Sequence, residues 1–465
     1  MKMRTERDSL GERKIPADAY YGVQTDRALE NFPISGLKAA ASYVEATVQI
    51  KRAAAIVNRD LDLLDKVVAD AIVKAADEVI RGKLREWFRV DVFQAGAGTS
   101  HNMNANEVLA NRAIEILGGE KGDYTRVHPN DHVNMSQSTN DVCPTAIRIA
   151  VLLELESFLP ALENLEKQFL AKGKEFDSVV KSGRTHLMDA VPVRLGQEFS
   201  AYGVNLRKHR EAVVKAADSC SELGIGGTAA GTGLNSHPRY RQAMVEEIGR
   251  NMGMSFRTAD DYFEAMQSLR PMVEVSQAMR NLAQDLVRIA NDIRLLGSGP
   301  KTGLAELQLP AVQPGSSIMP GKVNPSIAEM VNMVCFQVIG CDTTILMAAQ
   351  AGQLELNVMM PVVAHDLIHE IAILKQAMRV FDERCIKGLR ADVQRCQEYA
   401  ENSVSIVTVL NPRIGYQAGA EIAKEYLSSG KSIRELVRSK GLLDDRELES
   451  VFDLRKMTEP GIHKK

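Results

Sequence analysis

Apolar residues recur at alternating steps of four and three along the middle of the chain, which is the spacing of one face of a long α-helix. The clearest of these apolar seams is Val275, Met279, Leu282, Leu286, Ile289, Ile293 and Leu296. At about 1.5 Å per residue it predicts a helix roughly 33 Å long. Two further seams repeat the spacing, at 151–169 and at 367–381. Several such helices in one chain predict a helix bundle.

Small residues accompany the first seam at Ala278, Ala283 and Ala290. A second apolar stripe on a bundle helix offers a surface for close packing against another subunit. This stripe therefore suggests an oligomer. The same pattern also fits a contact inside one bundle, and periodicity alone does not separate the two.

The two ends of the chain differ from its middle. The first ~140 residues mix polar turns with short helical stretches such as Val67 to Val79, and the last ~70 form a small helical region broken at Asn411-Pro412 and Gly415. We therefore predict an N-terminal, mostly helical domain at 1–140. The long-helix bundle is predicted at 141–395 and a small helical domain at 396–465.

Composition narrows the class of protein. The 465 residues carry a net charge of −3, with 45% hydrophobic and 25% charged residues, which is typical of a soluble globular protein. Nothing in this balance points to nucleic acid or a membrane surface as a partner. No apolar leader follows Met1 and no apolar run reaches spanning length, so a cytoplasmic location is expected. The six scattered cysteines are interpreted as reduced structural thiols.

One segment stands out as a functional loop, GSSIMPGKVNP at 315–325. Its glycines and prolines exclude a regular helix. Ser316 and Ser317 offer hydroxyl and N–H groups, Lys322 a positive charge and Asn324 an orienting amide, which together suit an anion. A plain serine-glycine connector is the alternative.

Three other polar segments are candidates for ligand binding. GAGTSHNMN at 96–104 precedes a predicted helix near Glu107 to Leu117, and QSTND at 137–141 precedes the helix of the 151–169 seam. Their hydroxyl and amide groups suit helix N-caps, and a helix N-terminus also attracts anions, so the two roles can coexist. The third segment, SGRTHLMD at 182–189, contains Thr185 and His186, where His186 is either a ligand-binding or a structural histidine.

Taken together these blocks resemble the aspartase/fumarase superfamily. GSSIMPGKVNP is similar to its signature, and SGRTHLMDAVP, QSTND, HPND and GTAAGTGLN are similar to its shared blocks, over almost the whole chain. The resemblance implies an all-α, three-domain fold with a long central five-helix bundle. It also implies a homotetramer with a twenty-helix core, in which each active site draws on three subunits.

Details within the motifs lean toward the aspartase branch. GAGTSHNMN, QSTND and AGQLELNVM at 351–359 resemble its versions of these blocks, while Met360 and Met188 depart from common family residues. The implied activity is reversible deamination of L-aspartate to fumarate and ammonia. A class II fumarate hydratase is the alternative reaction, and a non-catalytic helical structural protein is a more remote one.

The resemblance also assigns roles. Ser316 is the expected base, with His186 as the alternative base. The positions around the carboxylate that becomes an aci-carboxylate are matched by Thr99, Ser138, Thr139 and Ser317. Those around the other carboxylate are matched by Lys322, Asn324 and Thr185. Those near the amino group are matched by Asn140 and His186. Glu329 resembles the acidic partner that orients the histidine.

Two further expectations come from the resemblance. His128, Asn130 and Asp131 resemble a second dicarboxylate-binding site. The only ligand that the chemistry requires is a small dicarboxylate, and no cofactor is needed. Activation by a divalent metal is left open.

Overall fold

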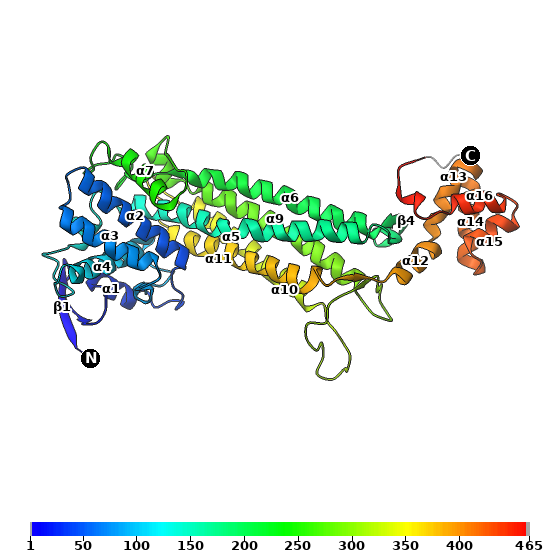
Figure 1. The fold of residues 1–465 in the computed structure, drawn as a ribbon, viewed down its shortest axis with the longest axis horizontal. Helices are drawn as coiled ribbons and strands as arrows, with labels where there is room; N and C mark the ends of the chain where they lie inside the picture. The colour runs from blue at the N-terminus through cyan, green and yellow to red at the C-terminus, as the bar shows by residue number, and fades with distance from the viewer. Residues whose placement is uncertain (1, 462–465) are drawn as a thin grey trace. The chain divides into compact units, whose positions relative to one another are not determined.

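The computed structural model describes residues 2–461 and is built mainly of α-helices (Figure 1). Within this range the strands form small two-stranded sheets only. The all-α class implied by the family resemblance is therefore confirmed. Met1 and residues 462–465, at the outer ends of the first and last predicted domains, lie outside the described residues.

The chain divides into two compact units. The first contains residues 1–160, 209–284 and 334–375, and the second contains 161–208, 285–333 and 376–465. Each of the long helices has residues in both units. The division does not test the boundaries near 140 and 395, which stay a prediction.

The first unit begins with an antiparallel hairpin followed by four helices. The hairpin is β1 (Met3–Asp8) and β2 (Gly11–Pro16), and the helices are α1 (Val23–Asn31), α2 (Ala41–Asp60), α3 (Lys66–Ile80) and α4 (Thr99–Ile116). Helix α3 matches the predicted stretch, and the Asp65 carboxylate caps it by accepting the N–H groups of Val67 and Val68. Helices α2, α3 and α4 enclose an apolar core that includes Val48, Ile72 and Val108. The same unit contains α7 (Tyr240–Met252), α8 (Tyr262–Gln267) and the short parallel pair β5 (Glu222–Leu223) and β6 (Arg257–Thr258).

Helix α4 begins earlier than predicted. The sequence predicted a helix near Glu107 to Leu117 after the segment 96–104, but the helix already starts at Thr99. Gly98, with φ at 86°, supplies the left-handed turn that lets the chain enter the helix there. The polar residues that follow are buried, among them Ser100, His101 and Asn102.

Five long helices make up the bundle: α5 (Thr139–Glu175), α6 (Leu195–Asp218), α9 (Arg270–Leu296), α10 (Ser326–Gln350) and α11 (Met360–Phe381). In the first unit, Lys375 of α11 donates to Glu154 of α5 at 2.9 Å. In the second unit, the Phe169 ring of α5 lies 5.9 Å from that of Phe199 in α6 and 6.1 Å from that of Phe381 in α11. In the same unit, Tyr202 of α6 donates to Asp292 of α9 at 2.9 Å, and Asn332 of α10 donates to Asn291 of α9 at 2.8 Å. Together these contacts link all five helices and confirm the predicted bundle.

The predicted seams form the bundle core. Every residue of the 275–296 seam is buried, and so are the seam residues of α5 and α11. Ala278, Ala283 and Ala290 are also buried within the chain itself. For these alanines the contact inside one bundle, rather than a surface for another subunit, is the correct interpretation.

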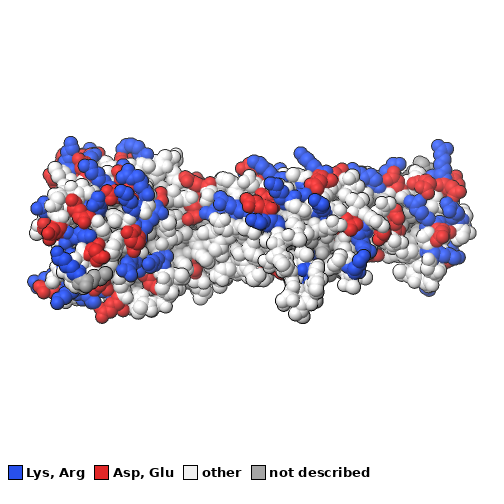
Figure 2. Space-filling view, turned by 60° about the horizontal axis from the view of Figure 1, so that its bottom comes forward, with Lys and Arg blue, Asp and Glu red and all other residues white. Residues whose placement is uncertain are grey.

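Helix α10 instead carries an exposed apolar face. Met333, Phe336 and Met347 are 64%, 59% and 58% exposed. On the side of the molecule in Figure 2, few charged side chains cover the middle of the bundle. Among the described residues α10 alone is long and apolar enough to cross a membrane by length and composition, and one such helix is weak evidence for a span.

The second unit contains the predicted C-terminal helices and two small sheets. The helices are α12 (Val393–Asn402), α13 (Asn411–Ile414), α14 (Tyr416–Ser429), α15 (Ile433–Ser439) and α16 (Asp445–Val451). The last four of these helices, α13 to α16, pack around a separate core that includes Leu410, Leu436 and Phe452. The sheets pair β3 (Val180–Thr185) with β4 (Met188–Arg194) and β7 (Leu307–Gln308) with β8 (Arg390–Ala391).

All six cysteines are free and buried, as the sequence predicted for structural thiols. Burial raises the pKa of the Cys143 thiol to about 11 and that of Cys385 to about 12.

Candidate active site

The predicted base lies in the long loop between α9 and α10 of the second unit (Figure 1). The Ser316 hydroxyl oxygen accepts the backbone N–H groups of Ile318 and Met319, at 3.2 and 3.0 Å. The half-buried serine therefore sits at the centre of a small turn whose N–H groups point at its oxygen. Such donors favour a negative charge on that atom.

Within this connection, residues 315–324 form a smaller closed loop, the Ser316 loop, whose two ends are joined by hydrogen bonds. The Gly315 N–H donates to the Lys322 carbonyl at 2.8 Å, and the Asn324 side-chain amide donates to the Gly315 carbonyl at 2.7 Å. A side chain at position 315 would collide with the Lys322 carbonyl, so glycine is required there. The Lys322 side chain and Ser317 are exposed. The structure thus brings Ser316, Ser317, Lys322 and Asn324 together in one loop.

Thr185 and His186 lie at the tip of the β3–β4 hairpin, also in the second unit. Strand pairing places Thr185 opposite Met188, so that His186 and Leu187 form a two-residue turn with φ of 56° and 60°. Turns of this kind usually contain glycine or asparagine, because other side chains resist positive φ. Both Thr185 and His186 are exposed.

Glu329 lies in the first turn of α10. Its carboxylate forms an ion pair with Arg294 of α9, at 3.9 Å. Its predicted role of orienting His186 stays a prediction.

In the first unit, Thr99 and the segment 138–140 are linked by α4. Thr99 is the first residue of α4 and is exposed, and Asn102 in the following turn donates its amide to the Thr139 hydroxyl at 3.1 Å. The Asn140 amide nitrogen donates to the Ala229 carbonyl at 2.8 Å. That contact fixes the Asn140 side chain with its nitrogen turned toward the protein.

Capping, one of the two roles considered for segment 137–141, is observed. The Ser138 hydroxyl accepts the Asn140 N–H at 3.2 Å, and the Ser138 N–H donates to Asp141 Oδ1 at 2.9 Å. Asp141 Oδ2 accepts the N–H groups of Gly226 and Thr228, each at 3.0 Å. Burial raises the pKa of Asp141 to about 6. These bonds fix the start of α5 while its N-terminus remains suited to an anion.

A buried lysine beneath this segment was not predicted. Lys51 is 0% exposed and donates to Asn134 Oδ1 at 2.8 Å and Gln137 Oε1 at 2.9 Å. Burial lowers the pKa of Lys51 to about 7. Its only signal in the sequence is one charged residue on the buried face of an apolar helix. A lysine in such a pattern is usually a solvated side chain.

The predicted second site is a turn beside a polar cavity of the first unit. His128 Nδ1 accepts the N–H groups of Asn130 and Asp131, each at 3.2 Å. His128 and Asn130 line a cavity of about 450 Å³ together with Arg7 and Arg27, and the Arg27 guanidinium is paired with the Asp8 carboxylate of the same lining at 2.8 Å. The third predicted residue, Asp131, lies 3.4 Å from His128 Nδ1 through its carboxylate.

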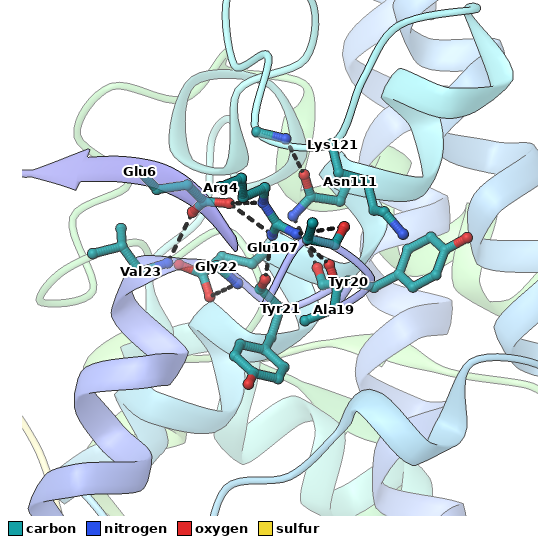
Figure 3. Close-up of polar contacts among 12 residues, drawn as sticks. Arg4, Glu6, Ala19, Tyr20, Tyr21, Gly22, Val23, Glu107, Asn111 and Lys121 are labelled. Atoms are coloured by element: carbon teal, nitrogen blue, oxygen red, sulfur yellow. Dashed lines mark hydrogen bonds and ion pairs between the residues drawn. The ribbon is translucent and has the colours of Figure 1, made fainter. Parts of the chain in front are cut away.

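Two carboxylates hold the start of α1, and one of them, Glu107, also lines this cavity. Glu107 accepts the N–H of Gly22 at 2.8 Å, and Glu6 accepts that of Val23 at 2.9 Å while also holding Arg4 (Figure 3). Burial raises the pKa of Glu107 to about 7.

Two family models match the chain. The model described as "Lyase" matches residues 11–340, and the one described as "Fumarase C C-terminus" matches residues 406–459.

Similar proteins cover the chain almost completely. An aspartate ammonia-lyase of Bacillus subtilis is 48% identical over 99% of this chain and 97% of its own length. A class II fumarate hydratase of Halobacterium salinarum is 50% identical over 99% of this chain and 98% of its own length. The crystal structure of a fumarate lyase:delta crystallin from Brucella melitensis bound to cobalt has a TM-score of 0.96 and 49% identity, and covers 99% of this chain and 100% of that one.

Proposed function

The chain belongs to the lyase family, and from this we propose that it catalyses the reversible deamination of L-aspartate to fumarate and ammonia. Full-length similarity to aspartate ammonia-lyases, at 46–48% identity, supports this reaction. The structural observation that carries the proposal is the Ser316 turn, in which two N–H groups converge on a hydroxyl oxygen.

The reaction must remove a barely acidic proton from Cβ. Proton loss becomes feasible only if the adjacent carboxylate accepts the electrons as a doubly negative aci-carboxylate, so donors must surround that group. In the proposed assignment Thr99, Ser138, Thr139 and Ser317 supply them. The N-termini of α4 and α5, where Thr99 and Thr139 stand, add the positive end of a helix dipole.

Ser316 acts as the base through its alkoxide. A free serine is far too weak an acid to ionise, but the N–H groups of Ile318 and Met319 already point at its oxygen. Lys322 in the same loop adds a positive charge. Closure of this glycine-containing loop over bound substrate would exclude water. In this proposal His186 assists at the leaving group, oriented by Glu329.

The remaining assignments concern the other carboxylate and the amino group. Lys322, Asn324 and Thr185 hold the second carboxylate. Asn140 accepts a hydrogen bond from the substrate ammonium. Its amide nitrogen is engaged by the Ala229 carbonyl, which leaves Oδ1 as the atom that faces a ligand.

Fumarate hydration is the second candidate function, and the Halobacterium fumarate hydratase at 50% identity favours it. The test is to follow fumarate absorbance with L-aspartate and then with L-malate as substrate. We expect rapid fumarate formation from aspartate and little or none from malate. Malate dehydration at an equal or higher rate would make the protein a fumarase, and no turnover of either substrate would favour a structural role.

We further propose a homotetramer in which each site draws on three subunits. The exposed apolar face of α10 supports an assembly, because a stripe containing Met333, Phe336 and Met347 would otherwise remain in water. Six free, buried thiols support a reducing, cytoplasmic location. Light scattering of the purified protein measures the assembly, and a monomer would contradict it.

Two smaller proposals complete this function. The chemistry uses only side-chain and backbone donors, so treatment with EDTA should leave deamination unchanged. A loss of activity that a divalent metal restores would reveal metal activation. The His128–Asp131 turn and its cavity form a second dicarboxylate site, which calorimetry with fumarate would detect as a second binding event that His128→Ala removes.

A further inference from the structure

A fully buried carboxylate in the second unit holds two cations. Glu306 is 0% exposed, and Arg184 Nη1 donates to its Oε1 and Oε2 at 3.0 and 2.9 Å. Lys181, which is 1% exposed, brings its Nζ within 3.5 Å of Oε2 and 3.1 Å of Glu198. A buried ion cluster of this kind is balanced only while every member is present.

Both cations belong to the hairpin that presents Thr185 and His186. Lys181 and Arg184 lie on β3, and Arg184 immediately precedes Thr185. The hairpin tip has positive φ at His186 and Leu187 without a glycine, a conformation that persists only when surrounding contacts hold it. The Arg184–Glu306 bonds are anchoring contacts one residue away from this strained turn.

The backbone of Glu306 belongs to the chain that leads to Ser316. Its N–H donates to the Leu296 carbonyl at 2.9 Å, and its carbonyl accepts the Asp392 N–H at 2.9 Å. The next residue begins β7, which pairs with β8, and the chain then enters the Ser316 loop. Glu306 therefore lies in the segment between α9 and α10 that also carries Ser316, and its side chain contacts the hairpin that carries Thr185 and His186.

We propose that Glu306 is a positioning residue that ties the Thr185–His186 hairpin to the chain leading into the Ser316 loop. The inference rests on the proposed function for the roles of these groups. Glu306 touches no reacting atom, and it acts through Arg184 and Lys181. Because a misplacement of about 1 Å can reduce an enzyme's rate about a hundredfold, loss of this tie should lower turnover far more than it lowers stability.

The first test compares Glu306→Gln with Glu306→Asp. Glutamine keeps the shape of the side chain but removes its charge. Aspartate keeps the charge on a shorter side chain, and the flexible Arg184 side chain can move to stay paired with it. The matched control is Glu154→Gln, which breaks the 2.9 Å ion pair with Lys375 in the bundle. We expect kcat/KM for aspartate to fall more than about tenfold in Glu306→Gln, measured well below its melting temperature. Glu306→Asp and the control should stay within about threefold of wild type.

Two results would overturn the proposal at this stage. One is a Glu306→Gln variant with wild-type kcat/KM. The other is an equal loss of kcat/KM in Glu154→Gln, which would show that the effect comes from a general loss of stability. If Glu306→Gln does not fold, Arg184→Gln replaces it, because glutamine removes the positive charge that pairs with Glu306. The same loss of kcat/KM is then expected.

The second test does not depend on turnover. Hydrogen exchange is followed in the hairpin, residues 180–194, and in the segment 307–324. Removing the tie should accelerate exchange in both segments together in Glu306→Gln, while Glu154→Gln changes neither. Unchanged exchange in either segment would contradict the proposal. A wild type without deaminating activity would refute the proposed function alone, since the exchange result would still stand.

Discussion

The Ser316 hydroxyl accepts two backbone hydrogen bonds in a turn that lies inside a loop whose closed ends require Gly315. The turn also explains why a loop serine suits the role of the proposed base. A short side chain at the centre of converging N–H groups is already surrounded by donors, so little reorganisation is needed when it loses its proton.

Replacing Ser316 by alanine should abolish turnover while the assembly and the affinity for substrate largely persist. The change removes the proposed base but only one hydroxyl from an exposed loop, which barely affects packing. Steady-state kinetics, light scattering and fumarate binding measure the three properties. Residual activity within about tenfold of wild type, or ~1.4 kcal/mol of barrier, would point to another base, with His186 the first to examine.

Lys322→Ala should weaken binding and catalysis together, because a dicarboxylate loses its main cationic partner. We expect KM for aspartate to rise and kcat to fall, each by about tenfold or more. Lys301→Ala, another lysine of the same inter-helix segment with no assigned role, is the matched control. An unchanged KM in Lys322→Ala would remove Lys322 from the carboxylate site.

Individual helices are held in place by contacts that cannot be predicted from their own local sequence. Helix α1 begins at Val23 without a side-chain cap of its own. Its free N–H groups are satisfied instead from distant elements, by Glu6 of β1 and by Glu107 of α4, which accepts the N–H groups of Gln24 and Thr25 at 2.8 and 3.1 Å (Figure 3).

The burial of Glu107 predicts a pH dependence of stability. Its pKa is about 7 in the folded chain against an ordinary value of 4.5, so the folded state binds this proton more tightly. The contribution to stability is present below pH 4.5 and is lost as pH rises through 7. Glu107→Gln cannot titrate. The difference in unfolding free energy, wild type minus variant, should therefore fall over this range by up to about 3 kcal/mol. Urea unfolding at both ends of the range measures it, and a difference independent of pH would refute it.

The long helices were predictable and their supporting contacts were not. A seam such as Val275 to Leu296 repeats over six turns or so of helix, about 3.6 residues each, and periodicity of that length is specific to a long helix with one buried face. Lys51, Glu306 and the turn at His186 left no such signal. Each is a single residue whose role depends on a partner far away in sequence, so only the folded chain brings it together with that partner.

At the scale of the whole molecule, the candidate site residues fall into both compact units. Thr99 and 138–140 belong to the first, while Thr185, His186 and the Ser316 loop belong to the second. The family blocks in the sequence predicted which residues carry the chemistry. They did not show which of these residues meet in one site, because contacts between segments far apart in the chain or between subunits have no period or spacing in one sequence.

The shared-site proposal predicts that two inactive variants restore activity when mixed. Ser316→Ala and Thr139→Val should each be inactive alone, and co-expression should recover up to about a quarter of wild-type activity. Recovery follows if native Ser316 and native Thr139 of one site come from different chains. Mixing tagged variants of the same substitution is the control. No recovery in mixed tetramers would place both residues in one chain.

Because every native cysteine is buried, a thiol introduced at the surface would react almost alone. Ile318 is 84% exposed beside Ser316, so Ile318→Cys would take up a maleimide dye selectively in the Ser316 loop. We expect the fluorescence of this dye to change when fumarate binds and the loop closes, and a dye on Leu427→Cys, at a 74% exposed position in α14, to report no change. Because the buried native thiols would not react with the dye, movement of the Ser316 loop could be measured directly as a change in fluorescence.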